Sequence, residues 1–523
     1  MRGSILAVLA VVSTITASPA YDSQIAFKTF KGEPVSVPPV FDKIGGEAKQ
    51  WVQNGRDFIH RDGLTYEVVT HPMFTNHRLR IAEPKICDPG VKQYSGYFDI
   101  AHGKHLFFWF FESRSSPETS DFVYWTNGGP GVSSFFGLLF ELGPCRIANE
   151  GKNVTWNPHS WNENFNILFV DQPVGVGFSY QDAGGPKVDR SWQAGEDMYA
   201  FFQLFFSRFP EYADSNFHMA GESYGGTYIP NSAAVVYKHN KALEVQPVPG
   251  LRRLNLASVI LANGLSDPYI QFAAFGEWLC EGPYAIFEDP NDPQCRSWRR
   301  KAQVCSRWTQ ACYTFGTRFV CSNAEKYCWD NFIADFEKFP INMYDVRKSC
   351  DRSPDKDGPL CYKEAEWLPV WLDDEDIKKE LGVNPAINFT SISQKVYKDF
   401  LSSGDLMYYS AGLLTDLVDD GIRLLVYAGD TDAACNALGQ SRWVEKLPSV
   451  FHKEYAQTPT LAWRVKSTGN TVGTVRSIGG DGATAGNITF VTIHEAGHMA
   501  PYDKPEESLD MITRWVKDVP LTE

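Results

Sequence analysis

The stretch NFHMAGESYGGTYIPNSAAVVYKH, residues 216–239, decides the fold, because it passes from a strand through a glycine turn into a helix. Residues 216–223 favour a strand and residues 228–239 favour a helix. Between them, GESYG (221–225) matches the pattern G-x-S-x-G. Glycine makes up about 7% of average sequence, so the string alone is weak evidence. Its position between a strand and a helix predicts an exposed nucleophile, Ser223, on a strained turn.

A serine hydroxyl is a poor nucleophile until a base removes its proton, so a hydrolase of this kind needs an acid and a histidine downstream. Asp430 and Asp432 follow one apolar run that is typical of a strand, and His494 and His498 follow another. The carboxyl ends of such strands are where an α/β sheet gathers its site. The sequence therefore predicts a Ser-Asp-His triad, with solvated loop residues as the alternative.

The string HEAGH (494–498) also matches H-E-x-x-H, a zinc-peptidase pattern that requires a helix. A β-branched run leads into it, Gly497 falls inside it and Pro501 follows closely, all of which disfavour a helix. A catalytic zinc also needs three protein ligands, and no third ligand stands out. The sequence therefore favours a site without a metal.

The rest of the chain alternates between short apolar runs and helical periodicity, which predicts an α/β protein with a mostly parallel sheet covered by helices on both sides. Residues 268–369 interrupt this rhythm and hold eight of the 11 cysteines. We interpret them as an insertion over the sheet, stapled by disulfides because it lacks enough core of its own. The other predicted strands are residues 105–114, 121–127, 166–173, 256–264, 422–430 and 487–498, and further helices are predicted around residues 198–206 and from 505 onward.

The N-terminus predicts entry into the secretory pathway. Residues 1–20 combine Arg2, a short apolar run and small residues, which is typical of a signal peptide. Residues 21–85 contain few β-rich runs and are interpreted as a propeptide or an N-terminal arm. Three sequons, at Asn153, Asn388 and Asn487, predict glycosylation, and the cysteines predict disulfides. The expected location is a vacuole-like or lysosome-like compartment, or the exterior.

Composition excludes several classes of protein. The 523 residues are 43% hydrophobic and 21% charged, a balance that fits neither a disordered chain nor a membrane bundle. No later segment has ~18 uninterrupted apolar residues, so no membrane span is expected. A net charge of −14 without a basic run disfavours binding to nucleic acid. The odd cysteine count indicates one unpaired thiol.

The stretch WTNGGPG (125–131) follows a predicted strand, and its glycines let the backbone approach a substrate closely. With the amide of Tyr224 it would form an oxyanion hole, although a plain Gly-Pro turn is the alternative. Together with ELGPC, VDQPVGVGFSY, GESYGGTYIP, NGLSDP, VYAGDTD and GHMAP, this stretch resembles the serine carboxypeptidase family, and most of all its carboxypeptidase Y type. The resemblance runs in register from about Pro84 to the last helix.

This resemblance implies an α/β-hydrolase fold, with residues 86–267 and 370–523 as the catalytic domain and 268–369 as a cap. It implies removal of C-terminal amino acids from peptides and proteins through a serine acyl-enzyme at acidic pH, without a cofactor. Residues that match the family's functional positions are the nucleophile Ser223, the acid Asp432, the base His498, and the oxyanion amides of Gly129 and Tyr224.

The resemblance also implies that Asn127, Glu141 and Glu222, with Trp125 beside them, bind the terminal carboxylate of the substrate. Two carboxyl groups held close cannot both ionise easily, so one keeps its proton and can donate to a bound carboxylate. Binding should therefore be best at acidic pH.

The family's cysteine pattern implies one free thiol, Cys435, in the substrate pocket, and no disulfide between Val132 and the region of Ser393, where the family usually has cysteines. Side chains expected to make the pocket apolar are Val132, Phe135, Phe136, Phe140 and Met499. The implied disulfides are Cys280–Cys295, Cys305–Cys328, Cys312–Cys321 and Cys350–Cys361, and Cys87 and Cys145 remain to pair with each other.

Three other functions are alternatives to this one. An acyltransferase of the same family would resolve the acyl-enzyme with an alcohol, but plant members of that kind tend to have Asp where this chain has Glu222. A secreted binding protein without catalysis would not need an intact triad, oxyanion loop and carboxylate-binding group. A simple esterase would lack the last of these.

Overall fold

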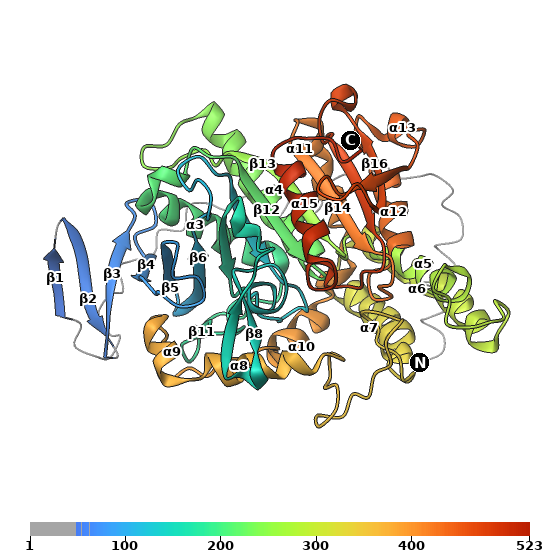
Figure 1. Ribbon diagram of the computed structural model, residues 1–523, viewed down its shortest axis with the longest axis horizontal. Coiled ribbons are helices and arrows are strands. Elements are labelled where there is room, and N and C mark those ends of the chain that lie inside the picture. The colour runs from blue at the N-terminus through green and yellow to red at the C-terminus, as the bar shows by residue number, and fades with distance from the viewer. Residues whose placement is uncertain (1–48, 54, 62, 523) are drawn as a thin grey trace.

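The computed structural model describes residues 49–53, 55–61 and 63–522 (Figure 1). The predicted signal peptide and residues 21–48 lie outside this part of the chain. A single large mixed sheet runs through the molecule in the order β1-β2-β3-β4-β5-β6-β10-β7-β12-β13-β14-β17-β16-β15, with β11 paired to β6. Its strands are β1 Lys49–Gln53, β2 Arg56–Arg61, β3 Leu64–Thr70, β4 Arg78–Ala82, β5 Gln93–Ile100, β6 Lys104–Phe111, β7 Phe122–Thr126, β10 Asn166–Val170, β11 Tyr180–Gln181, β12 Phe217–Glu222, β13 Leu256–Ala262, β14 Arg423–Gly429, β15 Leu461–Arg464, β16 Thr471–Ile478 and β17 Ile488–Ile493; β8 Cys145–Ala148 and β9 Asn153–Trp156 form a separate hairpin.

The six strands from β10 to β17 in this order are parallel, as the sequence predicts. Successive residues of a strand point to opposite faces, so an apolar run is divided between two cores. In β7, Phe122 and Tyr124 belong to one hydrophobic cluster, whereas Val123 and Trp125 belong to the other. This double burial explains why the strands are apolar throughout.

Helices cover both faces of the sheet. The buried side chains of α3 lie in the first cluster, and those of α15 lie in the second. No helix of the described chain is both long and apolar enough to cross a membrane. The helices are α3 Ser191–Arg208, α4 Gly225–Val245, α5 Pro268–Glu281, α6 Pro293–Phe315, α7 Arg318–Phe336, α8 Trp367–Leu372, α9 Glu375–Glu380, α10 Gln394–Ser403, α11 Thr415–Asp419, α12 Ala437–Lys446, α13 His452–Tyr455, α14 Ala500–Asp503 and α15 Pro505–Val516.

Strands β1 to β4 form an antiparallel extension at one end of the sheet, whereas the sequence suggested few strands before residue 85 (Figure 1). Arg80 of β4 is fully buried, and its guanidinium pairs with Asp99 of the neighbouring β5 at 2.8 Å. A buried arginine is tolerated only with such a partner. The sequence does not reveal β4 as a strand, because a buried arginine interrupts its apolar pattern and the partner of that arginine lies on the neighbouring strand.

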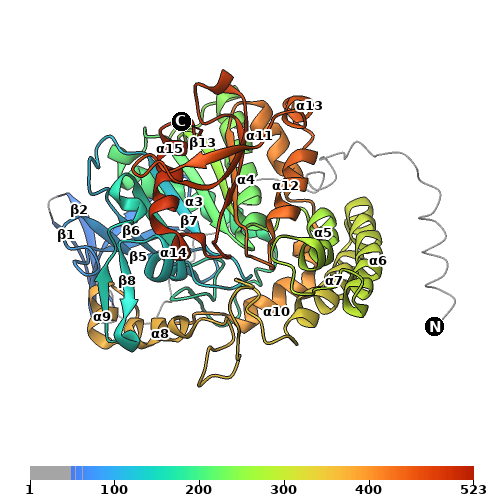
Figure 2. The same cartoon turned by 45° about the vertical axis from the view of Figure 1, so that its right-hand side comes forward.

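The insertion packs α5, α6 and α7 side by side at the opposite end of the molecule (Figure 2). Buried aromatic side chains of these three helices, among them Phe275, Trp298 and Phe332, belong to the same hydrophobic cluster as α3. The insertion therefore shares the core of the main domain, in addition to having the disulfides that the sequence led us to expect.

Candidate active site

Ser223 lies on the tight turn between β12 and α4, as the sequence predicts. Its φ of 62° is unusual for a residue with a side chain, and such strain persists only when the surroundings fix it. The backbone of Ser223 accepts a hydrogen bond from Leu265 N and donates one to Ala262 O at the end of β13. A Cβ at Gly226 would come within 2.4 Å of Leu265 N, so this close approach requires glycine. The turn thus holds the hydroxyl beyond the strand end.

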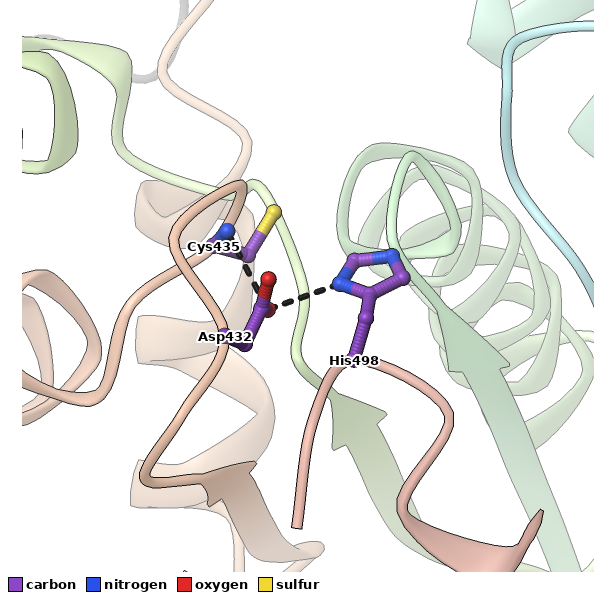
Figure 3. A group of neighbouring side chains, drawn as sticks. All are labelled: Asp432, Cys435 and His498. Atoms are coloured by element: carbon purple, nitrogen blue, oxygen red, sulfur yellow. Dashed lines mark hydrogen bonds and ion pairs between the residues drawn. The ribbon is translucent and has the colours of Figure 1, made fainter. Parts of the chain in front are cut away.

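Asp432 and His498 are hydrogen-bonded partners. Nδ1 of His498 lies 2.7 Å from Oδ2 of Asp432, and both side chains are buried (Figure 3). Oδ2 also accepts from Asn263 Nδ2 at 2.7 Å, and Oδ1 accepts from the amide of Ala434 at 2.9 Å. The carboxylate is therefore fixed on three sides, and it can orient the imidazole.

Asp430 and His494, the alternatives to these two residues, lie elsewhere in the loops. Oδ1 of Asp430 accepts a hydrogen bond from the amide of Glu495, and His494 donates its amide to Val472 O. Residues 494–498 form a turn and not a helix, so the H-E-x-x-H string lacks the geometry of a zinc site.

Asp432, Cys435 and His498 are the one group of potential metal ligands within the described residues (Figure 3). Burial, with the nearby Asp432 charge, raises the pKa of the Cys435 thiol well above its usual range. A thiol binds zinc as the thiolate, and Asp432 already accepts several hydrogen bonds. The donor set therefore fits a triad better than a metal.

The predicted oxyanion loop lies against the nucleophile turn. A Cβ on Gly128 would lie 2.2 Å from the backbone nitrogen of Tyr224, so the two segments touch through their backbones. Gly129 has a φ of 108°, which favours glycine. Among the described residues, neither the amide of Gly129 nor that of Tyr224 donates a hydrogen bond, so both remain available to a substrate.

The loop is held in place at the position where the resemblance implies that a disulfide is missing. The amide of Ser133 donates to Ser391 O at 3.0 Å, and the amide of Ser393 donates to Gly131 O at 2.8 Å. Oδ1 of Asp171 accepts from Ser133 Oγ at 2.5 Å, and burial raises the pKa of this carboxyl to about 7. Backbone pairing thus replaces the missing covalent bond.

Asn127 joins the two glutamates that the resemblance assigns to the substrate carboxylate. Its Oδ1 accepts from Trp125 Nε1 at 2.8 Å and from the amide of Gly137 at 2.9 Å, which fixes the orientation of the amide. Its Nδ2 then donates to Glu141 Oε1 at 3.1 Å and to Glu222 Oε1 at 3.2 Å. Trp125 thus orients Asn127 from the core.

The carboxyl groups of Glu141 and Glu222 are almost completely buried, and each has an Oε2 atom without a hydrogen-bond partner within the described residues. Burial and the charge of Glu141 raise the pKa of Glu222 well above its usual range, and burial also raises that of Glu141. Two close carboxyls in a dry site hold a proton between them. The pair can therefore donate a hydrogen bond to an anion.

A small cavity of about 80 Å³ brings the predicted groups together. Four lining residues come from the insertion and were missed by the sequence analysis: Tyr344, Leu360, Tyr362 and Ala365. Phe135, Trp125, Glu141 and Cys435 are not among its lining residues. The lining residues expected from the sequence are Asn127, Gly129, Val132, Phe136, Phe140, Glu222, Ser223, His498 and Met499, and Gly128 completes the wall.

The insertion also supports the triad through its backbone. Tyr344 O accepts the amide of His498 at 2.7 Å, and Met343 O accepts the amide of Ala433, next to Asp432, at 3.0 Å. No local motif marks residues 343–344 for this role. Asn263 could have been noticed, because an Asn-Gly pair ends the predicted strand 256–264.

The structure contains the five disulfides of the predicted pairing, including Cys87–Cys145, and Cys435 is a buried free cysteine. Among the sequons, Asn153 and Asn388 are exposed. Asn487 is half-buried against Gly479, so it is the least accessible of the three.

Comparisons with known proteins agree with this geometry. A family model described as serine carboxypeptidase matches residues 84–518. Carboxypeptidase Y homolog A of Talaromyces stipitatus is 40% identical over 436 residues, which cover 82% of this chain and 73% of that protein. Carboxypeptidase Y of Candida albicans is 38% identical over 454 residues, which cover 86% of this chain and 78% of that protein.

Among solved structures, Kex1(delta)p, a prohormone-processing carboxypeptidase from Saccharomyces cerevisiae, has a TM-score of 0.70 at 22% identity and covers 87% of this chain and 96% of its own. That likeness shows the α/β fold alone. The family match and the two relatives, taken with the site, establish that this chain belongs to the serine carboxypeptidase family and is a serine-type carboxypeptidase.

Proposed function

We propose that Ser223 attacks the carbonyl carbon of the last peptide bond of a substrate. His498, which Asp432 holds in position, takes the serine proton. The amides of Gly129 and Tyr224 donate hydrogen bonds to the oxyanion that forms. The intermediate collapses to a Ser223 ester, and His498 gives the proton to the departing amino acid. Water, activated by the same histidine, then releases the shortened peptide. The 2.7 Å contact between His498 and Asp432, on the cavity that Ser223 lines, carries this proposal.

Recognition of the free C-terminus is proposed for Asn127, Glu141 and Glu222. When the glutamate pair holds a proton, it can donate to the substrate carboxylate, while Asn127 donates to both glutamates and holds the pair in place. The raised pKa of Glu222 keeps that proton at acidic pH, and the proton is lost as the pH rises. Binding of peptide acids should therefore weaken with rising pH, which supports activity in an acidic compartment.

Substrates with an apolar C-terminal residue should suit the cavity, since Val132, Phe136, Phe140 and Met499 line it. Five disulfides are consistent with an oxidising route of synthesis, so we propose passage through the secretory pathway to an acidic vacuole-like compartment or to the exterior. The sequons at Asn153, Asn388 and Asn487 stay proposals as glycosylation sites, as does the propeptide before residue 85.

A labelling experiment tests this function. A phosphonyl fluoride that reacts with activated serines should inactivate the protein, and peptide mass spectrometry should find the adduct on Ser223. Release of the C-terminal residue from a blocked dipeptide should stop in Ser223→Ala and continue in the presence of a chelator. Inhibition by the chelator, with activity remaining in Ser223→Ala, would replace this proposal with a metal mechanism.

A further inference from the structure

The side chain of Tyr224 is anchored to a buried carboxylate that the proposed mechanism does not use. Oη of Tyr224 donates to Oδ2 of Asp405 at 3.0 Å. Asp405 lies in a short helix, Asp405–Met407, far from the nucleophile turn in sequence, and both side chains are buried. The residue whose amide would complete the oxyanion hole is therefore tied to a distant segment.

Asp405 is itself fixed by the start of α3. Oδ1 accepts the amide of Ser191 at 3.1 Å, and Oδ2 accepts the hydroxyl of the same serine. The N-cap of α3, Arg190, provides no side-chain cap, so Asp405 supplies the acceptor that a helix N-terminus needs. A negative charge there is also stabilised by the helix dipole. Asp405 thus joins α3 to the nucleophile turn.

The insertion covers this carboxylate with a second acid. Glu325 of α7 is fully buried beside Asp405, and both of its oxygens lack a side-chain partner in the described structure. Gly404, just before Asp405, allows α7 to come so close that a Cβ there would lie 2.3 Å from the backbone nitrogen of Ser322. The neighbouring Cys321 is held to α6 by its disulfide to Cys312.

Burial and the charges around this pair favour a neutral Glu325. Arg190 is the cation that faces both carboxyls, and the other titratable groups nearby are the hydroxyls of Tyr224, Tyr228 and Tyr397. Burial and the Asp405 charge raise the pKa of Glu325 well above its usual range. A protonated Glu325 lets α7 cover Asp405 without placing two negative charges side by side.

We propose that Asp405 is a positioning residue for the oxyanion hole: by holding the Tyr224 hydroxyl it fixes the Tyr224 ring and, with it, the amide that receives the oxyanion, while Glu325 acts as the neutral cover. The Tyr224 ring packs edge-on against Tyr228 and Phe400, with centroid distances of 5.0 Å and 6.1 Å. The hydrogen bond from its hydroxyl to Asp405 then fixes the position of the ring between them. This inference rests on the proposed function, since it needs an oxyanion at Tyr224.

Tyr224→Phe, which removes only the hydroxyl, tests the proposal. Its matched control is Tyr212→Phe, because Tyr212 is also buried and donates to a carboxylate, Glu112 Oε1, at 2.6 Å, but is not next to the nucleophile in the chain. Losing one oxyanion donor outright costs 10²- to 10³-fold in kcat, so a displaced donor should lower kcat by roughly 10-fold with KM nearly unchanged. Tyr212→Phe should keep the kcat of the wild type.

Asp405→Asn should lower kcat in the same way, and the double variant with Tyr224→Phe should fall little further, because both changes break one contact. Glu325→Gln, a neutral side chain of the same shape, should keep kcat from pH 5 to 8. Equal kcat in Tyr224→Phe and Tyr212→Phe, or an effect on KM alone, would overturn the proposal even if Asp405→Asn fails to fold. Activity remaining in Ser223→Ala would instead overturn the underlying function.

Discussion

The imidazole of His498 is held by the carboxylate of Asp432, with 2.7 Å between Nδ1 and Oδ2. Asp432 is fully buried, and Asn263 donates to the same oxygen. Because Nδ1 donates to the carboxylate, Nε2 is the atom left to accept a proton in the cavity that Ser223 shares. This contact orients the histidine so that it can act as the base for Ser223.

Asp432→Asn should lower kcat by about 10⁴-fold, because an amide in this position favours the wrong tautomer of the histidine. Asp430→Asn is the matched control: Asp430 lies two residues away, and its carboxylate interacts with the loop amide of Glu495 and with Tyr284, not with His498. It should keep most of the activity. Steady-state kinetics on a blocked dipeptide measure both. Equal losses in the two variants would contradict the choice of acid.

Cys435 should behave as a buried thiol close to the site and not as a nucleophile. Its raised pKa keeps it protonated, and it is 5% exposed, so a small mercurial should inhibit slowly. Cys435→Ser should stay active and become resistant to the mercurial. Alkylation after unfolding without reduction should label one cysteine, found by mass spectrometry on the Cys435 peptide. A mercurial that still inhibits Cys435→Ser would show that the sensitive group lies elsewhere.

Arg80→Met should destabilise the protein by up to about 3 kcal/mol, because it removes the fully buried cation of Asp99 and leaves that carboxylate with Arg78, 2.7 Å away. Arg56→Met provides the control, since Arg56 is 47% exposed in its pair with Glu67 and should contribute less than about 1 kcal/mol. Urea unfolding of the two variants gives the comparison. Similar unfolding midpoints would mean that the Arg80–Asp99 pair does not stabilise the contact between β4 and β5.

Thermal stability should fall as the pH rises from about 4 to 8. Burial raises the folded-state pKa of Asp171 to about 7 and raises that of Glu222 and Glu325, so the folded state binds more protons than the unfolded chain in this range. This contribution is full below the unfolded pKa of ~4 and is lost as the pH rises through the folded values. Carboxyls with lowered pKa, such as Asp335, act below this window, whereas His77 and His218, whose pKa burial lowers, oppose the decline below about pH 6.5.

Glu325→Gln should flatten this decline, because the amide cannot ionise. Melting temperatures at half-unit pH steps give the slope for each protein. The same slope in the wild type and in Glu325→Gln between pH 6.5 and 8 would contradict the assigned protonation of Glu325.

Local patterns in the sequence were enough to predict the nucleophile turn, since the glycines and the flanking periodicity all lie within 24 residues of chain. The triad partners were predictable because apolar strands end directly before them. Contacts that join distant segments were not: Tyr344 supports His498 from the insertion, and Arg80 is neutralised by Asp99 on the neighbouring strand. Nothing in the sequence around Asp405 indicates that its carboxylate oxygens accept hydrogen bonds from Ser191 and Tyr224.

The relation between substrate charge and pH tests the central claim most directly. The measurement is kcat/KM for a blocked dipeptide as the free acid and as the amide, from pH 4 to 8, in the wild type and in Glu222→Gln. The account predicts that the wild type prefers the acid most at low pH, and that this preference becomes much less dependent on pH in Glu222→Gln, whose amide donates at any pH. Equal changes on the acid and the amide would contradict recognition of the C-terminal carboxylate by Glu222.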